Sequence, residues 1–136
     1  MPDVSEATWL GVAGFDRERG ARMSRSIEDV KNWMNMFRWI VKLIRDEFGI
    51  DEKILVRNAA LETDIGLSIE QVEQVLEYIA DSFTIRFPDG TLNEVMRLEE
   101  LCMLASWIKG FYKRPEFISA GFEASCRSLN HIVDAA

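Results

Sequence analysis

Apolar residues recur at intervals of three and four along most of the chain, which is the period of an amphipathic α-helix. Sustained alternation of apolar and polar residues, the period of a strand, is absent from the sequence. The pattern therefore predicts an all-α bundle of four or five helices. The first helix is expected to start near Ser26 and to end at Gly49, with the apolar positions Val30, Trp33, Met34, Phe37, Val41, Ile44 and Phe48.

A second helix is predicted to begin at Ser68, where the Ser-x-x-Gln spacing to Gln71 is that of a capping box. Before it, residues 49–67 form a predicted loop of a length that tends to carry function in compact domains. The core face of this helix is expected to consist of Ile69, Val72, Val75, Leu76, Ile79 and Phe83. Acidic residues at spacings of three and four line its outer face, namely Glu70, Glu73, Glu77 and Asp81.

Turn and cap signals divide the rest of the chain. Pro88-Asp89-Gly90 indicates a turn, and the spacing of Thr91 and Glu94 predicts a second capping box at the start of a short helix. Helical spacing then continues from Leu98 to Phe111.

The last helix is predicted to follow Pro115, because proline ends a helix and is tolerated in the first turn of the next. Its apolar face is expected to be Ile118, Phe122, Cys126, Leu129 and Val133. We thus expect an N-terminal arm over residues 1–25, a helical domain over 26–113 and a helical extension over 114–136 that packs on the same domain.

The first helix carries more apolar surface than one core needs. If Phe37, Val41 and Ile44 face the core, then Met36, Trp39 and Leu43 group on another side, at about 100° per residue. An exposed patch containing tryptophan is unusual for a monomer. We expect this stripe to be covered by the C-terminal helix through Ile118, Phe122 and Leu129, or by a second copy of the chain in a homodimer.

Composition narrows the class of protein. The chain has 136 residues, 48% of them apolar and 29% charged, enough for one domain with its own core. A net charge of −7 argues against nucleic acid as a partner. The whole acidic excess lies in residues 60–100, which favours a basic protein surface instead. Charged residues interrupt every apolar stretch and no signal peptide precedes them, so we expect no membrane span and a cytoplasmic protein.

Candidate chemistry is sparse. Cys102 and Cys126 stand far apart in the sequence without a CxxC motif, and the only histidine is His131. We therefore expect reduced, partly buried thiols and no metal site. Phosphate-binding, hydrolase and metalloprotease motifs are also absent, so no catalytic residue and no enzyme activity are predicted.

Several strings over residues 30–108 resemble the acyl carrier protein, or phosphopantetheine-attachment, family. The matching pieces are Glu47-Phe48-Gly49-Ile50, Asn58-Ala59-Ala60-Leu61, Asp64-Ile65-Gly66, Val72-Glu73 and Ile85-Arg86-Phe87-Pro88-Asp89. The resemblance leaves both ends of the chain unexplained.

The attachment motif of that family is Asp-Ser-Leu preceded by Asp-Leu-Gly-x, and the string Asp64-Ile65-Gly66-Leu67-Ser68-Ile69 is one residue shorter. If Ser68 takes the attachment position, Ile69, Val72 and Glu73 follow at the spacings of the family. An ungapped alignment would place Ile69 there and turn the helix by about 100°. We adopt the gapped alignment, in which Leu67 replaces the acid that helps the family's transferase recognise the serine.

The resemblance implies an acyl-carrier-like helical bundle that carries a group and makes no bonds itself. Ser68 would bear 4′-phosphopantetheine, placed by a phosphopantetheinyl transferase, and its thiol would hold an acyl or aminoacyl chain as a thioester. A helix start suits the phosphodiester, because its free N–H groups and dipole stabilise anions. Acyl-transferring and acyl-modifying enzymes with basic docking surfaces would recognise Asp64, Glu70, Glu73, Glu77 and Asp81. An acyl pocket between the helices would involve Val72, Val75, Leu76 and Ile79.

A second function stays open at this point. The chain could be a degenerate member of the family that acts unmodified, as an interaction or regulatory module. The shortened motif favours this alternative, whereas a serine in the correct helical register favours the group carrier. Ser68 also has a simpler role as an N-cap, which stabilises a helix by about 1 kcal/mol, and the acidic residues could be ordinary solvated surface.

Overall fold

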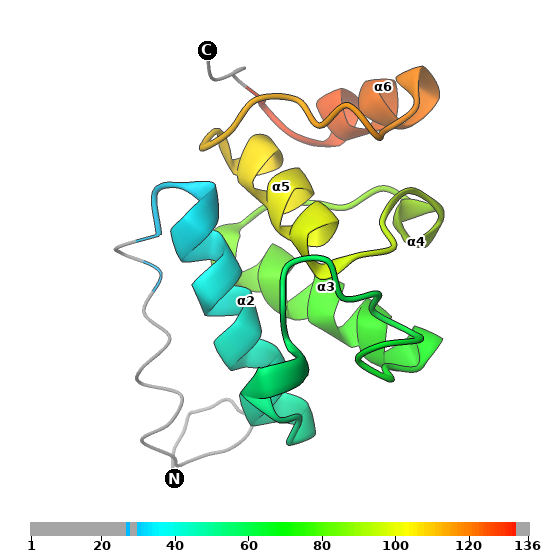
Figure 1. Ribbon diagram of the computed structural model, residues 1–136. Coiled ribbons are helices and arrows are strands. Elements are labelled where there is room, and N and C mark those ends of the chain that lie inside the picture. The colour runs from blue at the N-terminus through cyan, green and yellow to red at the C-terminus, as the bar shows by residue number, and fades with distance from the viewer. Residues whose placement is uncertain (1–26, 28–29, 133–136) are drawn as a thin grey trace, which may run out of the picture.

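The computed structural model describes Ile27 and residues 30–132. The predicted arm over residues 1–25, Ser26 and Val133 lie outside this part of the chain. Within it the all-α prediction is confirmed, and the extended backbone pairs only at one isolated bridge, between Ala60 and Arg97. Five α-helices and one 3₁₀ turn follow in the order α2 (Trp33–Phe48), η2 (Glu52–Ile54), α3 (Ile69–Phe83), α4 (Thr91–Glu94), α5 (Leu98–Lys109) and α6 (Ala120–Leu129) (Figure 1).

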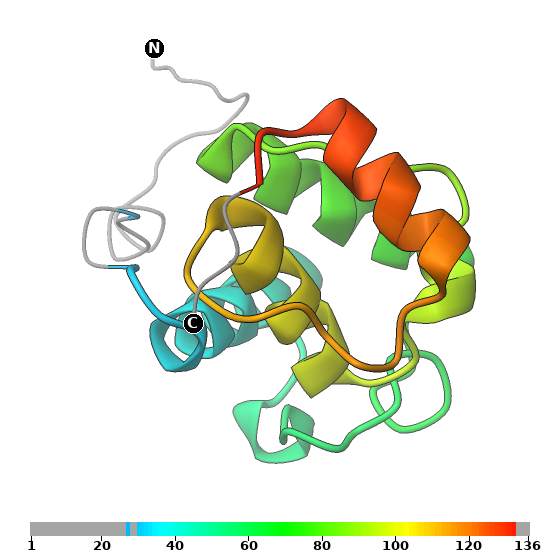
Figure 2. The same ribbon diagram turned by 90° about the horizontal axis from the view of Figure 1, so that it is seen from above.

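Helix α5 forms the centre of the molecule. Its sequence is apolar around most of its circumference, and such a helix needs cover on every side. Helix α2 packs along one side, and α6 lies on the opposite side of α5 from α2 (Figure 1 and Figure 2). The residues of α5 that are buried are Leu98, Leu101, Cys102, Leu104, Ala105, Ser106, Trp107 and Ile108.

The orientation of α2 differs from the prediction. Met36, Trp39 and Leu43 lie in the main core, whereas Phe37 and Phe48 are only partly buried. The reason is charge: Arg38, Lys42 and Arg45 gather on one side of the helix at about 100° per residue, and the opposite side is the one that can lose its water.

The stripe of Met36, Trp39 and Leu43 is covered, as expected, but the predicted cover is wrong. Helix α2 packs mainly against α5 and also against α3, while α6 lies beyond α5. The Trp39 ring meets Phe83 of α3 edge to face, with 4.9 Å between the ring centroids.

Helix ends correct two expectations and confirm a third. Asn32 caps α2, its Oδ1 accepting a hydrogen bond from the Asn35 N–H at 2.9 Å, so the helix begins later than Ser26 would place it. Gly49 ends the same helix in the left-handed conformation, as predicted. The last helix starts at Ser119, four residues after Pro115, and Ser119 Oγ accepts from the Phe122 N–H at 3.2 Å.

The predicted capping box of Thr91 and Glu94 is not formed. Gly90, with φ of +89°, is the N-cap of α4 and provides no side-chain hydrogen bond. Thr91 Oγ1 instead donates to the Pro88 carbonyl at 2.6 Å and stabilises the predicted turn. Glu94 is thereby free to bond outside its own helix.

The C-terminal extension is tied to the bundle at its far end. The side chain of Asn130 accepts from the Arg86 N–H and donates to the Arg86 carbonyl, both at 2.8 Å, in the manner of a neighbouring strand. Lys109, the last residue of α5, donates separately from Nζ to the Phe83 carbonyl at the end of α3, at 2.9 Å.

None of the described helices has the length and apolar character needed to span a membrane.

Phe122 and Leu129 of α6 differ in burial, and this difference predicts how much each contributes to the free energy of unfolding. Phe122 is buried, whereas Leu129 is 43% exposed, contrary to the expected apolar face. Phe122→Ala should lower the free energy of unfolding by about 3 kcal/mol or more, as buried phenylalanines do. Leu129→Ala is the control and should cost under about 1 kcal/mol. Urea unfolding measures both, and equal effects would show that α6 is docked through another face.

Candidate functional site at the start of helix α3

Ser68 stands at the N-terminus of α3, and the predicted capping box is confirmed. Its Oγ accepts from the Gln71 N–H at 3.1 Å, and Gln71 Oε1 accepts from the Ser68 N–H at 2.9 Å. The residue is exposed. The hydroxyl hydrogen has no acceptor among the described residues, so the oxygen remains open to reaction from solvent.

The loop before Ser68 is held by its own hydrogen bonds. Asp64 Oδ2 accepts from the Ala60 N–H at 2.8 Å, and the N–H of Ile65 donates to the Ala60 carbonyl at 3.0 Å. Gly66, with φ of +88°, makes a turn that side-chain-bearing residues rarely adopt. Asp64, predicted for partner recognition, thus has one carboxylate oxygen engaged inside the loop.

Leu67 occupies the place of the acid that the resemblance expects before the serine. Its N–H donates to the Leu61 carbonyl at 3.0 Å, and its side chain is only 3% exposed. A core residue therefore stands where a surface carboxylate would be.

A cavity of about 170 Å³ lies between the loop, α3 and α4. Val72, whose N–H bonds to the Ser68 carbonyl at 2.9 Å, places this cavity one helical turn from the serine. Its lining is largely apolar and consists of Ala60, Leu61, Glu62, Thr63, Val72, Leu92, Val95 and Met96. A dry cavity of about 150 Å³ admits benzene, so the space suits a short hydrocarbon group.

The four residues predicted for an acyl pocket do not share one space. Val72 lines the cavity, and Leu76 lines a separate groove. Val75 and Ile79 are fully buried in the core. Sequence spacing placed all four on one side of the helix, but it carries no information on where the opposite wall leaves room.

The acidic face of α3 is exposed over its whole length, at Glu70, Glu73, Glu77 and Asp81. Glu73 and Glu77 border an open groove of about 790 Å³, whose apolar lining includes Leu76, Phe87 and Leu92. A basic partner with an apolar contact residue would fit this combination.

Two exposed apolar residues near the site do not follow the sequence pattern. Ile69 is 54% exposed, so its expected place on the core face is wrong: at the first helical position its side chain lies beyond the packed layer. Met96 is 67% exposed and was not predicted as part of the site. Its carbonyl accepts from the Leu61 N–H at 2.9 Å, a pairing across the fold for which the sequence holds no signal.

The thiols do not contribute to this site. Cys102 and Cys126 are free and fully buried, deeper than the partial burial expected for them. Burial raises the pKa of Cys126 to about 11, with the carboxylates of Glu94 and Glu123 adding to the effect. Burial also raises the pKa of Cys102 well above its ordinary value, so both stay protonated near neutral pH. His131 is exposed near the end of the described chain.

Comparison with known proteins finds no matching family model, no matching curated protein and no matching solved structure. The geometry of the chain itself is therefore the basis for any statement about its role.

Substitution of Ser68 separates its structural role from any chemical one. Ser68→Ala should lower the free energy of unfolding by about 1 kcal/mol, because it leaves the Gln71 N–H without its acceptor. Ser68→Asn keeps a side-chain oxygen for that N–H and should cost only a few tenths of a kcal/mol. Thermal unfolding followed by circular dichroism measures both variants, and an equal loss in the two would contradict the capping role.

Proposed function

We propose that this protein is a group carrier of the acyl carrier protein type, with Ser68 as the attachment residue for 4′-phosphopantetheine. The observation that carries the proposal is an exposed serine hydroxyl at the start of α3, one turn from a largely apolar cavity. The order of elements supports it as well: a long helix, a long hydrogen-bonded loop, the serine-capped helix, a one-turn helix and a further long helix. The first three of these elements carry most of the strings on which the sequence resemblance rests.

Ser68 would accept a phosphopantetheinyl group that a transferase moves from coenzyme A, in which the group is held by a pyrophosphate bond. Its Oγ would attack the phosphorus and become the ester oxygen of a phosphodiester, the pyrophosphate P–O bond would break, and the nucleotide part of the donor would leave. The hydroxyl hydrogen would pass to a base on the transferase. The N-terminus of α3 would stabilise the resulting negative charge through its dipole and free N–H groups. When bound, phosphopantetheine supplies the thiol that bears an acyl chain as a thioester.

The surroundings of Ser68 serve the carried chain. The cavity beside Val72 would take the chain out of water, which is favourable by about 0.8 kcal/mol for each buried methylene. Exposed Ile69 and the acidic face of α3 would provide docking contacts for basic enzymes. Attraction between opposite charges mainly accelerates association.

An unmodified interaction module is the second candidate, and one observation favours it. Leu67 is a buried core residue in the position where the resemblance expects an acid used for recognition by the transferase. In this case Ser68 would act as an N-cap only, and the acidic face of α3 would carry the function.

Modification of Ser68 is tested by intact-mass analysis after incubation with a broad-specificity phosphopantetheinyl transferase and coenzyme A as the donor. We expect one added phosphopantetheine on the wild-type protein and none on Ser68→Asn, which keeps the cap but lacks a hydroxyl. Ser125→Ala is the control, because Ser125 is an exposed serine within α6 and away from any helix start, and it should be modified normally.

A wild-type protein that stays unmodified by several transferases, while its fold is intact, would favour the interaction module. Modification that persists in Ser68→Asn would show that another residue is the acceptor.

Docking through α3 should depend on charge. Glu73→Lys and Glu77→Lys should each slow modification by the transferase by at least about threefold at low ionic strength, because like charges then meet at the contact. Glu116→Lys is the charge-matched control, an exposed acid of the C-terminal extension that should have little effect. Near 1 M salt, where the Debye length is about 3 Å, the differences should vanish. Equal slowing by all three variants would contradict a specific docking face.

A further inference from the structure

One wall of the cavity is a helix that has little stability of its own. Helix α4 has only four residues, and its N-cap Gly90 provides no side-chain hydrogen bond. Isolated helices of this length are not stable, because nucleation is costly. Leu92 within α4 and Val95 directly after it line the cavity. The position of this wall must therefore be set by contacts outside α4.

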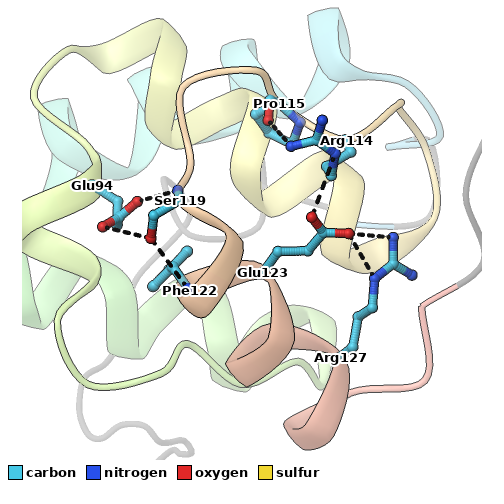
Figure 3. Close-up of polar contacts among 7 residues, drawn as sticks. All are labelled: Glu94, Arg114, Pro115, Ser119, Phe122, Glu123 and Arg127. Atoms are coloured by element: carbon cyan, nitrogen blue, oxygen red, sulfur yellow. Dashed lines mark hydrogen bonds and ion pairs between the residues drawn. The ribbon is translucent and has the colours of Figure 1, made fainter.

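The C-terminal extension supplies such a contact (Figure 3). Glu94, the last residue of α4, accepts from the Ser119 N–H through Oε1 at 2.9 Å, and its Oε2 lies 3.5 Å from Ser119 Oγ. Because Ser119 is the N-cap of α6, the Glu94 carboxylate also lies at the positive end of that helix. We call the pair Glu94 and Ser119 the latch.

Helix α6 is a firm anchor for the latch. Its own residues Phe122 and Cys126 are buried, and the Arg127 guanidinium lies over the Trp107 ring of α5, with 5.3 Å between its central carbon and the ring centroid. Glu123 forms ion pairs with Arg114 at 3.6 Å and with Arg127 at 3.0 Å (Figure 3). At the C-terminal end of α6, the Asn130 side chain forms hydrogen bonds with both the N–H and the carbonyl of Arg86.

The opposite end of the wall is held separately. The Met96 carbonyl accepts from the Leu61 N–H, and Ala60 pairs with Arg97. The segment between Thr91 and Met96 is thus fixed at its two ends, with the latch as the contact to α6 between them. Val95 is buried in the core and Leu92 only partly, so loss of the latch would let Leu92 and the middle of this segment shift outward.

We propose that the latch sets the capacity of the cavity, so that the C-terminal extension determines how long a hydrocarbon chain the protein shelters. That a hydrocarbon chain occupies the cavity rests on the proposed function. The hydrogen bonds of the latch and the cavity itself do not depend on that function. The volume of about 170 Å³ is close to the space of about 150 Å³ that takes the six carbons of benzene. We therefore expect chains beyond about six carbons to gain little from the cavity with the latch closed, and Glu94 is a positioning residue.

The experiment uses the unmodified full-length protein and straight-chain alcohols from butanol to decanol as probes. Binding is measured from the methyl NMR shifts of Val72, Leu92 and Val95. In the wild-type protein the dissociation constant should fall by about fourfold for each added methylene up to hexanol and then level off. In Glu94→Ala it should continue to fall to octanol or beyond. Amide exchange over residues 92–96 should be about tenfold faster in the same variant.

Two further variants separate the latch from general loosening. Glu94→Gln keeps an acceptor oxygen for the Ser119 N–H and should restore the wild-type limit. Glu123→Ala is the matched control, because it removes an acid that pairs with Arg114 and Arg127 but, within the described part of the chain, forms no hydrogen bond or ion pair with α4; it should also keep the wild-type limit.

The buried thiol of Cys126 reports whether α6 stays docked. Its reaction with a thiol reagent should remain slow in Glu94→Ala, as in Glu123→Ala. Rapid labelling of Cys126 would show that α6 has detached and would overturn the assignment of the effect to α4.

A common chain-length limit in the wild-type protein and Glu94→Ala would overturn the proposal, as would the absence of alcohol binding in both. Binding that occurs only in Glu94→Ala would support it, because the latch would then close the cavity altogether. None of these results depends on Ser68, so a failure of the group-carrier proposal would appear separately in the mass analysis.

Discussion

The burial of α5 over most of its circumference is the constraint on which the rest of the structure depends. A helix with apolar residues around most of its circumference cannot face water on any side without loss of stability. Helices α2 and α6 satisfy this need from opposite sides of α5. The C-terminal extension is therefore part of the core arrangement, and its contacts with Trp107 and with the end of α4 follow from that position.

Charged residues of opposite sign lie on the outer faces of two different helices. The basic residues of α2 occupy the side opposite to its core face, and the acidic residues of α3 line an exposed face of their own. Desolvation of either set would be costly, so each helix is held in one rotation about its axis. The same sorting leaves a surface of one sign along α3, next to Ser68.

The candidate site combines local and distant interactions. The capping box joins Ser68 and Gln71, which are three apart in the sequence, so the local sequence at the start of α3 is enough to form it. The cavity beside it needs the loop, α3 and the segment after α4 to meet, which the bond between Leu61 and Met96 achieves. The serine is thus a local feature, whereas the cavity beside it belongs to the tertiary fold.

The sequence by itself determined the helices, the long loop, the capping box of Ser68 and the exposed acids of α3, because each of these depends on neighbours within a few residues. It also held the signal for the core face of α2 in the three basic residues of that helix, although the apolar spacing alone pointed to Phe37 and Phe48. Only the tertiary structure decided that α6 covers α5, that Ile69 is exposed, and that Glu94 bonds to Ser119 in place of its own helix. These outcomes join residues far apart in the chain, or depend on where a packed layer ends, and periodicity carries no information on either.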